Sequence, residues 1–227
     1  MWLINSSIGR KVVMSVTGIC LILFLTFHMS MNVAALFSAE AYNMICAFLG
    51  VSWYAVAGTL ALALLAVIHL VYAFWLTMQN RAARGPERYA VTSKQQKVEW
   101  ASKNMLVLGL IVLVGLLLHL FNFWYNMMFA ELMGWAVTPA PHDGFAYIVA
   151  TFGNPLFVVL YIVWLAALWL HLSHGFWSAM QTLGWSGKTW YIRWKTIGII
   201  YVSLLFLGFI VVVLAFATGT APSLASC

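Results

Sequence analysis

Charged residues are scarce in this chain of 227 residues: Lys, Arg, Asp and Glu together make up 7%, and five residues are acidic. In contrast, 64% of the residues are hydrophobic, and the mean hydropathy is +0.96. A soluble domain of this length needs far more polar surface to face water. The composition therefore excludes an ordinary soluble globule and predicts an integral membrane protein.

Cysteine is also sparse, with three residues and no CxxC or CxxCH spacing. This spacing excludes covalent c-type haem, a zinc ribbon and a cysteine-held iron–sulfur cluster in this chain. The net charge is +6, but the basic residues lie in loops between apolar runs. Their placement argues against a nucleic-acid partner.

Five apolar runs are each long enough to cross a bilayer, which takes about 20 residues. They cover about 12–36, 52–78, 104–129, 148–180 and 196–217. Backbone groups in lipid must bond internally, so each run is expected to be a helix, and residues 1–227 form one all-α transmembrane domain. Pro155 predicts that the regular part of the fourth helix starts near it. The first run lacks a cleavage site after its basic pair and is interpreted as a retained span rather than a signal peptide.

All eleven Lys and Arg residues fall on one side of these five alternating spans. They are Arg10, Lys11, Arg81, Arg84, Arg88, Lys94, Lys97, Lys103, Lys188, Arg193 and Lys195. The positive-inside rule makes that side cytoplasmic, with the N-terminus inside and the C-terminus outside, in a cytoplasmic (inner) membrane. Glu40, Glu131 and Asp143 then lie outside. The basic loop at 80–103 serves as a topology determinant, as a docking surface for a soluble partner, or as both.

Five of the six histidines lie inside apolar runs, where ionisable side chains are costly and indicate function. Counting 1.5 Å per residue puts His28 and His119 about 24–26 Å from the cytoplasmic edge. The same count puts His69 and His171 about 14 Å from it. Four helices thus carry one histidine each, at two matched depths.

Level histidine pairs on different helices are what two bis-histidine b-type haems require. A zinc site needs three or four converging ligands, and a proton relay usually includes an intramembrane carboxylate, which all five runs lack. We therefore expect a four-helix core that binds two haem b groups. Small residues one turn from the histidines leave room for a porphyrin face, although ordinary helix packing explains them too. These small residues are Gly115, Ala73, Ala167 and Gly175.

Two further histidines have open roles. His174 lies one turn nearer the cytoplasm than His171 and matches the depth of His69 less well. It either packs through a backbone hydrogen bond or approaches a haem edge, a propionate or a quinone. His142 and Asp143 form either a proton-handling pair or, as we favour, two solvated loop residues.

Three stretches resemble the single-chain, five-helix, dihaem cytochrome b subunit of succinate:quinone oxidoreductases. They are RKVVMSVTGICLILFLTFHMSMN, IHLVYAFWLTMQNRAAR and HLSHGFWSAMQTLGW. The resemblance covers most of the chain and implies that His28 and His119 hold a distal haem and that His69 and His171 hold a proximal haem. The H-x-S-x-G pattern places the fourth-helix ligand on His171. One departure is Trp169, which stands where some quinol:fumarate reductases carry a membrane glutamate.

The resemblance also implies a function. This chain is expected to be the membrane anchor of a succinate dehydrogenase or quinol:fumarate reductase, passing electrons between a quinone, commonly menaquinone, and two cytoplasmic subunits. Those partners are a flavoprotein with FAD, which holds the succinate/fumarate site, and an iron–sulfur subunit; the whole complex is expected to dimerise. Lys188 and Arg193 are candidates for neutralising proximal-haem propionates.

Two alternatives remain. The gamma subunit of nitrate reductases is also a five-helix dihaem protein, but it carries two ligands on each of two helices and has the opposite N-terminal side. The second alternative is a non-redox transporter or channel, which would be colourless.

Overall fold

The computed structural model describes residues 6–84 and 100–221, and this part of the chain is helical without any strand. Five helices in it are long and apolar enough to cross a membrane, which confirms the predicted all-α, multi-span architecture. The long elements are α2 (Ser7–Val33), α4 (Trp53–Arg84), α6 (Met105–His119, continued by η2, Leu120–Phe129, and α7, Ala130–Leu132), α9 (Pro155–Thr182) and α10 (Lys188–Ala217). The short elements are η1 (Ala34–Leu36), α3 (Ala39–Phe48), α5 (Trp100–Lys103) and α8 (Gly144–Phe152).

The fourth apolar run is not one helix, because it breaks between α8 and α9. The side chain of Asn154 caps α9 by accepting a hydrogen bond from the backbone N–H of Leu156 at 3.0 Å. Pro155 follows at the first helical position, where its missing N–H costs nothing. The helix thus begins at the proline, as the sequence predicted, while residues 148–152 belong to the separate helix α8.

The fifth helix begins eight residues earlier than the apolar run suggested. Lys188, Arg193 and Lys195 were assigned to a loop, but they lie in the first turns of α10. Long basic side chains can reach water from a helix, so a helix extends past its apolar stretch without burying charge. Hydropathy therefore marked the lipid-facing part of α10 and missed its beginning.

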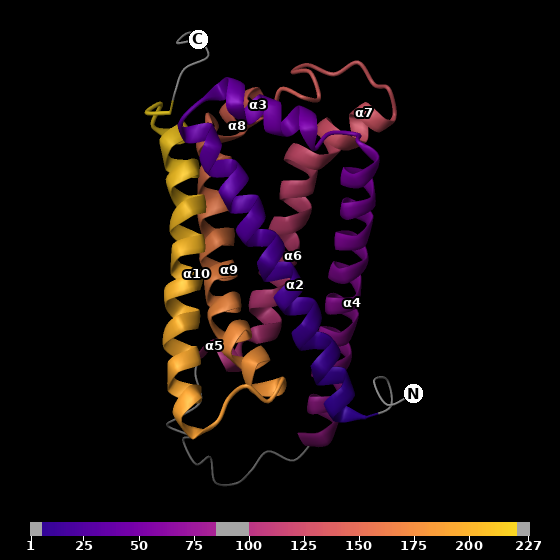
Figure 1. The fold of residues 1–227 in the computed structure, drawn as a ribbon, viewed down its shortest axis with the longest axis vertical. Coiled ribbons are helices and arrows are strands. Elements are labelled where there is room, and N and C mark those ends of the chain that lie inside the picture. The colour runs from indigo at the N-terminus through magenta and orange to yellow at the C-terminus, as the bar shows by residue number, and fades with distance from the viewer. Residues whose placement is uncertain (1–5, 85–99, 222–227) are drawn as a thin grey trace.

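The long helices are arranged around a four-membered ring (Figure 1). The order around the ring is α2, α4, α6 and α9. Helix α2 packs on both α4 and α9, and α6 packs on α9. The contact between α4 and α6 is slight. α10 packs outside the ring against α9 and α2. The ring is therefore well closed except along one side of α4.

The best-packed core lies at the end of the bundle away from the N-terminus. There α8 packs on α9 and α10, α3 packs on α8, and Phe145, Ile148 and Val213 are almost fully buried. By contrast, no residue in the most apolar stretch of α4 is buried within the chain. The two ends of the ring thus differ in how firmly the protein itself holds them.

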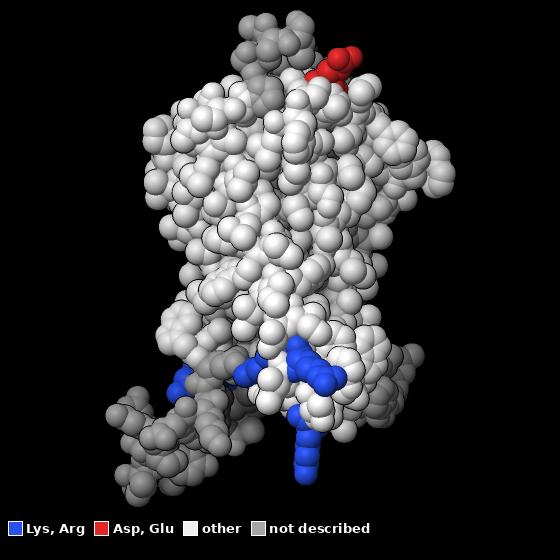
Figure 2. Space-filling view, turned by 60° about the vertical axis from the view of Figure 1, so that its left-hand side comes forward, with Lys and Arg blue, Asp and Glu red and all other residues white. Residues whose placement is uncertain are grey.

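Charge is separated along the bundle, as Figure 2 shows with basic residues at one end and acidic residues at the other. We call these the basic end, which carries Arg10, Lys11 and Lys103, and the acidic end, which carries Glu40, Glu131 and Asp143. Arg88, Lys94 and Lys97 lie outside the described residues. The predicted clustering of basic side chains therefore holds where the structure describes them.

Candidate functional site

The first histidine pair joins α2 to α6 in the half of the bundle nearer the acidic end. The ring centroids of His28 and His119 are 5.6 Å apart, and their planes are inclined at 84°. The rings of Phe24 and Phe209 lie 5.5 and 6.0 Å from the His28 ring. The pair is therefore set among aromatic side chains.

The second pair joins α4 to α9 nearer the basic end. The ring centroids of His69 and His171 are 6.5 Å apart, with an interplanar angle of 68°. Counting along the helices paired the same histidines, so the structure brings together the partners that the sequence matched by depth. Their role as iron ligands stays a prediction.

The spacing and chemistry of both pairs fit a metal held between two imidazoles. A metal–imidazole bond is about 2 Å long and a ring nitrogen lies about 1 Å from its centroid, so one shared metal sets the centroids about 6 Å apart. The two measured separations fall on either side of this value. In addition, the Nδ1 atoms of His119 and His171 are buried and have no hydrogen-bond partner in the described part of the chain. Each pair thus includes one buried ring nitrogen that no other described residue binds.

Asn32 lies one turn beyond His28 on α2. Its amide nitrogen donates to the His28 carbonyl at 2.8 Å and lies 3.4 Å from the His28 Nε2 atom. The hydroxyl of Tyr42 donates to the Asn32 side-chain oxygen at 3.3 Å. The H-x3-N spacing thus links α2 to α3.

Trp164 occupies the space beside His119. Its ring centroid lies 5.6 Å from that of His119, and its Nε1 atom donates to the Val112 carbonyl at 3.0 Å. A Cβ atom at Gly115 would lie 2.0 Å from the Trp164 ring. We expected Gly115 to leave room for a porphyrin; the structure corrects this, because the indole fills that room.

The helix widens directly after His119. Residues Leu120–Phe129 form a π-helix, which is rare and is frequently found at functional sites. Within it, Asn122 is buried and its amide donates to the Tyr161 hydroxyl at 3.3 Å. The Tyr161 ring lies 6.3 Å from the His119 ring. Hydropathy gives no sign of this widening.

Thr17 and Gly18 of α2 face His69. The Thr17 hydroxyl oxygen lies 3.1 Å from the His69 Nδ1 atom. A Cβ atom at Gly18 would lie 3.3 Å from the Cε1 atom of the same ring. On the other side of the pair, Gly109 would place a Cβ atom 3.7 Å from the His171 Cε1 atom. Sequence reasoning missed these neighbours, because the count of 1.5 Å per residue puts Thr17 and Gly109 about 9 Å from the basic edge, one turn short of His69 and His171.

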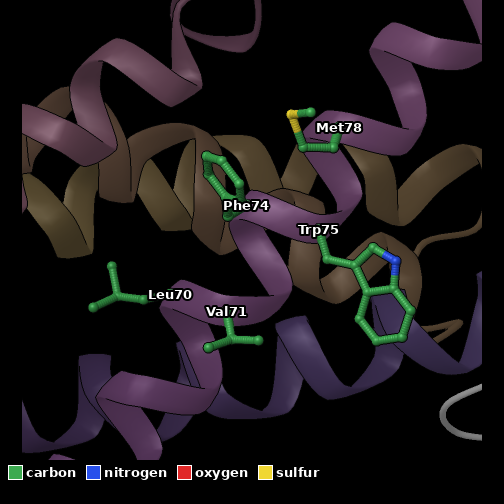
Figure 3. Close-up of a pocket in the computed structure, with 5 residues that line it drawn as sticks. All are labelled: Leu70, Val71, Phe74, Trp75 and Met78. Atoms are coloured by element: carbon green, nitrogen blue, oxygen red, sulfur yellow. The ribbon is translucent and has the colours of Figure 1, made fainter.

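An apolar hollow of about 530 Å³ begins one residue after His69 on α4 (Figure 3). Its lining is Leu70, Val71, Phe74, Trp75 and Met78. Figure 3 shows Phe74 and Met78 on the side of α4 away from α2, and Trp75 towards α2, where the Arg10 guanidinium lies 4.8 Å from its ring. The basic half of α4 thus presents an apolar surface that the other described residues leave open.

His174 and Trp169 of α9 have aromatic or hydroxyl neighbours. The His174 ring packs edge-on against Trp177, with centroids 5.0 Å apart. The Trp169 Nε1 atom donates to the Ser203 hydroxyl at 3.0 Å, so this position joins α9 to α10. Trp169 therefore has a packing role where some members of the resembled family carry a glutamate.

The acidic end is held together by Asp143 and Asn43. Asp143 caps α8 by accepting from the Ala146 N–H at 3.2 Å, and it also accepts from the Asn43 amide at 2.8 Å. Asn43 in turn accepts from the Phe145 N–H at 2.9 Å. Asp143 is thus a structural cap rather than a merely solvated residue, whereas its neighbour His142 is exposed.

Packing at this end also makes Cys46 a poor nucleophile. Its Sγ atom would lie 2.3 Å from a Cβ atom at Gly144, so α3 and α8 meet closely here. Burial raises the pKa of the Cys46 thiol to about 11. The thiol is therefore protonated at neutral pH.

The other polar candidates are spread over the surface. Lys188, Arg193 and Glu40 are exposed, and the Arg193 guanidinium lies 5.1 Å from the Trp190 ring. Within the described residues, no group of three or more His, Cys, Asp or Glu side chains comes together. The histidine pairs are therefore the candidate site. No family model, no curated protein and no solved structure matches this chain.

Proposed function

We propose that this chain is the membrane-anchor cytochrome b subunit of a succinate:quinone oxidoreductase, either a succinate dehydrogenase or a quinol:fumarate reductase. The observation that carries the proposal is the meeting of four histidines from four helices in two facing pairs. The resemblance of three stretches of the sequence to that family supports it. Both kinds of evidence select the same four residues.

In this proposal each histidine pair holds the iron of one haem b. His28 and His119 bind the distal haem, and His69 and His171 bind the proximal haem. When bound, haem supplies reversible one-electron redox chemistry whose potential depends on its ligands and its surroundings. The chain fixes the imidazoles on packed helices and excludes water with apolar and aromatic side chains, among them Phe24 and Phe209.

The charge separation supports an orientation for the subunit. The subunit lies in the cytoplasmic membrane. The positive-inside rule then puts the basic end and the N-terminus on the cytoplasmic side. The iron–sulfur and flavoprotein partners dock at that end, nearer His69 and His171. Menaquinone or another quinone is the membrane-side redox partner, while succinate and fumarate react on the flavoprotein.

A haem count on the purified chain tests the proposal. We expect b-type bands in the dithionite-reduced minus oxidised spectrum and two haems per chain by pyridine haemochrome assay. His171→Ala should retain one haem. His174→Ala is the matched control, three residues away on the same helix, and should retain both.

Two outcomes would contradict the proposal. A colourless wild-type chain, produced with ample haem, overturns the haem sites and favours a transporter. Loss of the same haem in His174→Ala but not in His171→Ala overturns the ligand assignment. Purification of the native complex, followed by an assay of succinate oxidation and fumarate reduction with different quinones, then tests the enzyme class.

A further inference from the structure

Thr17 is a buried polar residue in the middle of a helix that faces lipid and other helices. Its side chain is 5% exposed, and its hydroxyl lies 3.1 Å from the Nδ1 atom of His69, 52 residues away. This contact crosses from α2 to α4. It therefore belongs to tertiary structure rather than to local helix geometry.

The hydroxyl proton of Thr17 already has an acceptor on its own helix. The oxygen lies 2.9 Å from the Val13 carbonyl and 3.1 Å from the Met14 carbonyl. Carbonyls only accept, and a hydroxyl has one proton to donate. With that proton directed at a carbonyl, the Thr17 oxygen offers lone pairs to His69, whose Nδ1–H group is then the donor of the contact; the Met14 backbone is a second acceptor for the same ring.

This arrangement selects one tautomer of His69. With the proton on Nδ1, the Nε2 atom keeps its lone pair and is free to bind a metal. A hydrogen bond from the opposite ring nitrogen also makes a histidine ligand more basic. Gly18 assists, because a Cβ atom there would come within 3.3 Å of the ring.

The other ligand candidates have different surroundings. The Nδ1 atoms of His119 and His171 are buried without a hydrogen-bond partner in the described residues. His28 has an amide donor, Asn32, 3.4 Å from its Nε2 atom. A hydroxyl acceptor on a ring nitrogen thus distinguishes His69 from these three.

We propose that Thr17 is a positioning residue for His69: it accepts the Nδ1–H bond, leaves Nε2 for iron, and lowers the midpoint potential of the haem held by His69 and His171. This inference rests on the proposed function, since it concerns one of the two haem sites. A more basic ligand favours ferric over ferrous iron, which gives the direction of the effect.

The test is a redox titration of the purified dihaem protein with substitutions at Thr17. Thr17→Val keeps the branched shape and removes the acceptor, Thr17→Ser keeps the hydroxyl, and Thr17→Cys offers a weaker acceptor. Thr77→Val is the matched control on the helix of His69, because the Thr77 hydroxyl, within the described residues, bonds its own helix alone, at the Ala73 carbonyl. The haem that His171→Ala removes identifies which potential belongs to this site.

For Thr17→Val we expect about a 10–100-fold weaker affinity for this one haem, as is typical when a partner of a metal ligand is lost. Its midpoint potential should become more positive, while that of the other haem stays unchanged. Thr17→Ser and Thr77→Val should behave as wild type, and Thr17→Cys should lie between Ser and Val.

If Thr17→Val retains both haems with unchanged haem affinities and midpoint potentials, the proposed role of Thr17 is overturned, while the proposed function stands. If Thr17→Val loses the haem altogether, the Ser and Cys variants decide. A wild-type potential in Cys, or loss of the haem in Ser, contradicts the proposal. A wild-type chain without haem overturns the proposed function itself.

Discussion

At the scale of single residues, Gly115 of α6 lies against the Trp164 indole of α9, beside His119. The Trp164 indole lies where a Cβ atom would be, at 2.0 Å, and it packs next to His119. Overpacking a well-filled interior costs about 1–3 kcal/mol. The position therefore couples helix packing to the first histidine pair.

Gly115→Ala should displace Trp164, break its bond to the Val112 carbonyl, and disturb His119. We expect a lower melting temperature and, under the proposed function, partial loss of the haem assigned to His28 and His119, measured by thermal scans and haem content. Gly58→Ala is the control, since nothing lies within 4 Å of a Cβ atom there. Equal stability of the two variants would show that α6 and α9 adjust freely.

The ring planes within each histidine pair make a second prediction. The planes are inclined at 84° for His28 and His119 and at 68° for His69 and His171. When axial imidazole planes approach a right angle, the two iron orbitals that interact with them stay nearly equal in energy. Oxidised low-spin iron then gives a strongly anisotropic EPR signal.

Under the proposed function, we expect two such signals from the oxidised protein, with the larger anisotropy at the His28 and His119 site. The His171→Ala variant should retain that signal and lose the other. Spectra typical of parallel imidazole planes at both sites would contradict the ring geometry.

At the scale of helices, the acidic end depends on a few hydrogen bonds that connect α3 to α8. Asn43 makes two of them, one to the Asp143 carboxylate at 2.8 Å and one from the Phe145 N–H at 2.9 Å. The cap on α8 shares the same carboxylate. One side chain thus supports both the contact and the helix start.

Asn43→Ala should lower the free energy of unfolding by about 2 kcal/mol, given about 1 kcal/mol for each bond. The expected sign is a lower melting temperature in detergent. Asn104→Ala is the comparison, because the half-buried Asn104 side chain makes one hydrogen bond within the described residues, to the nearby Trp100 carbonyl. If both variants melt at the same temperature, Asn43 contributes no more than this local bond.

Sequence reasoning was strongest where the geometry of a helix is fixed. A constant rise per residue let counting place His28 level with His119 and His69 level with His171, and their rings do meet. It was weaker at helix ends, where the start of α10 at Lys188 depends on basic side chains reaching water. The contacts of Thr17 and Trp164 depend on how helices are rotated against each other, which spacing along one helix does not determine.

At the scale of the whole molecule, the separation of charge predicts how the chain lies in the membrane. Fusions of alkaline phosphatase, which is active outside the cytoplasm, should be active at the C-terminus and within 130–147. Fusions within 80–103 should be inactive there, and green fluorescent protein should give the reverse pattern. An inverted pattern would contradict the cytoplasmic position of the basic end.

The weak contact of α4 with α6 bears on how the molecule is assembled. α4 carries His69, rests mainly on α2 and has no buried residue in its most apolar stretch. Under the proposed function, a haem bound between His69 and His171 links α4 to α9 and closes the ring, because binding energy then becomes folding energy. A newly made chain that lacks haem would expose a loose helix to membrane proteases. The supply of haem would thus set how many copies of the protein survive in the cell, as well as how well each one conducts electrons.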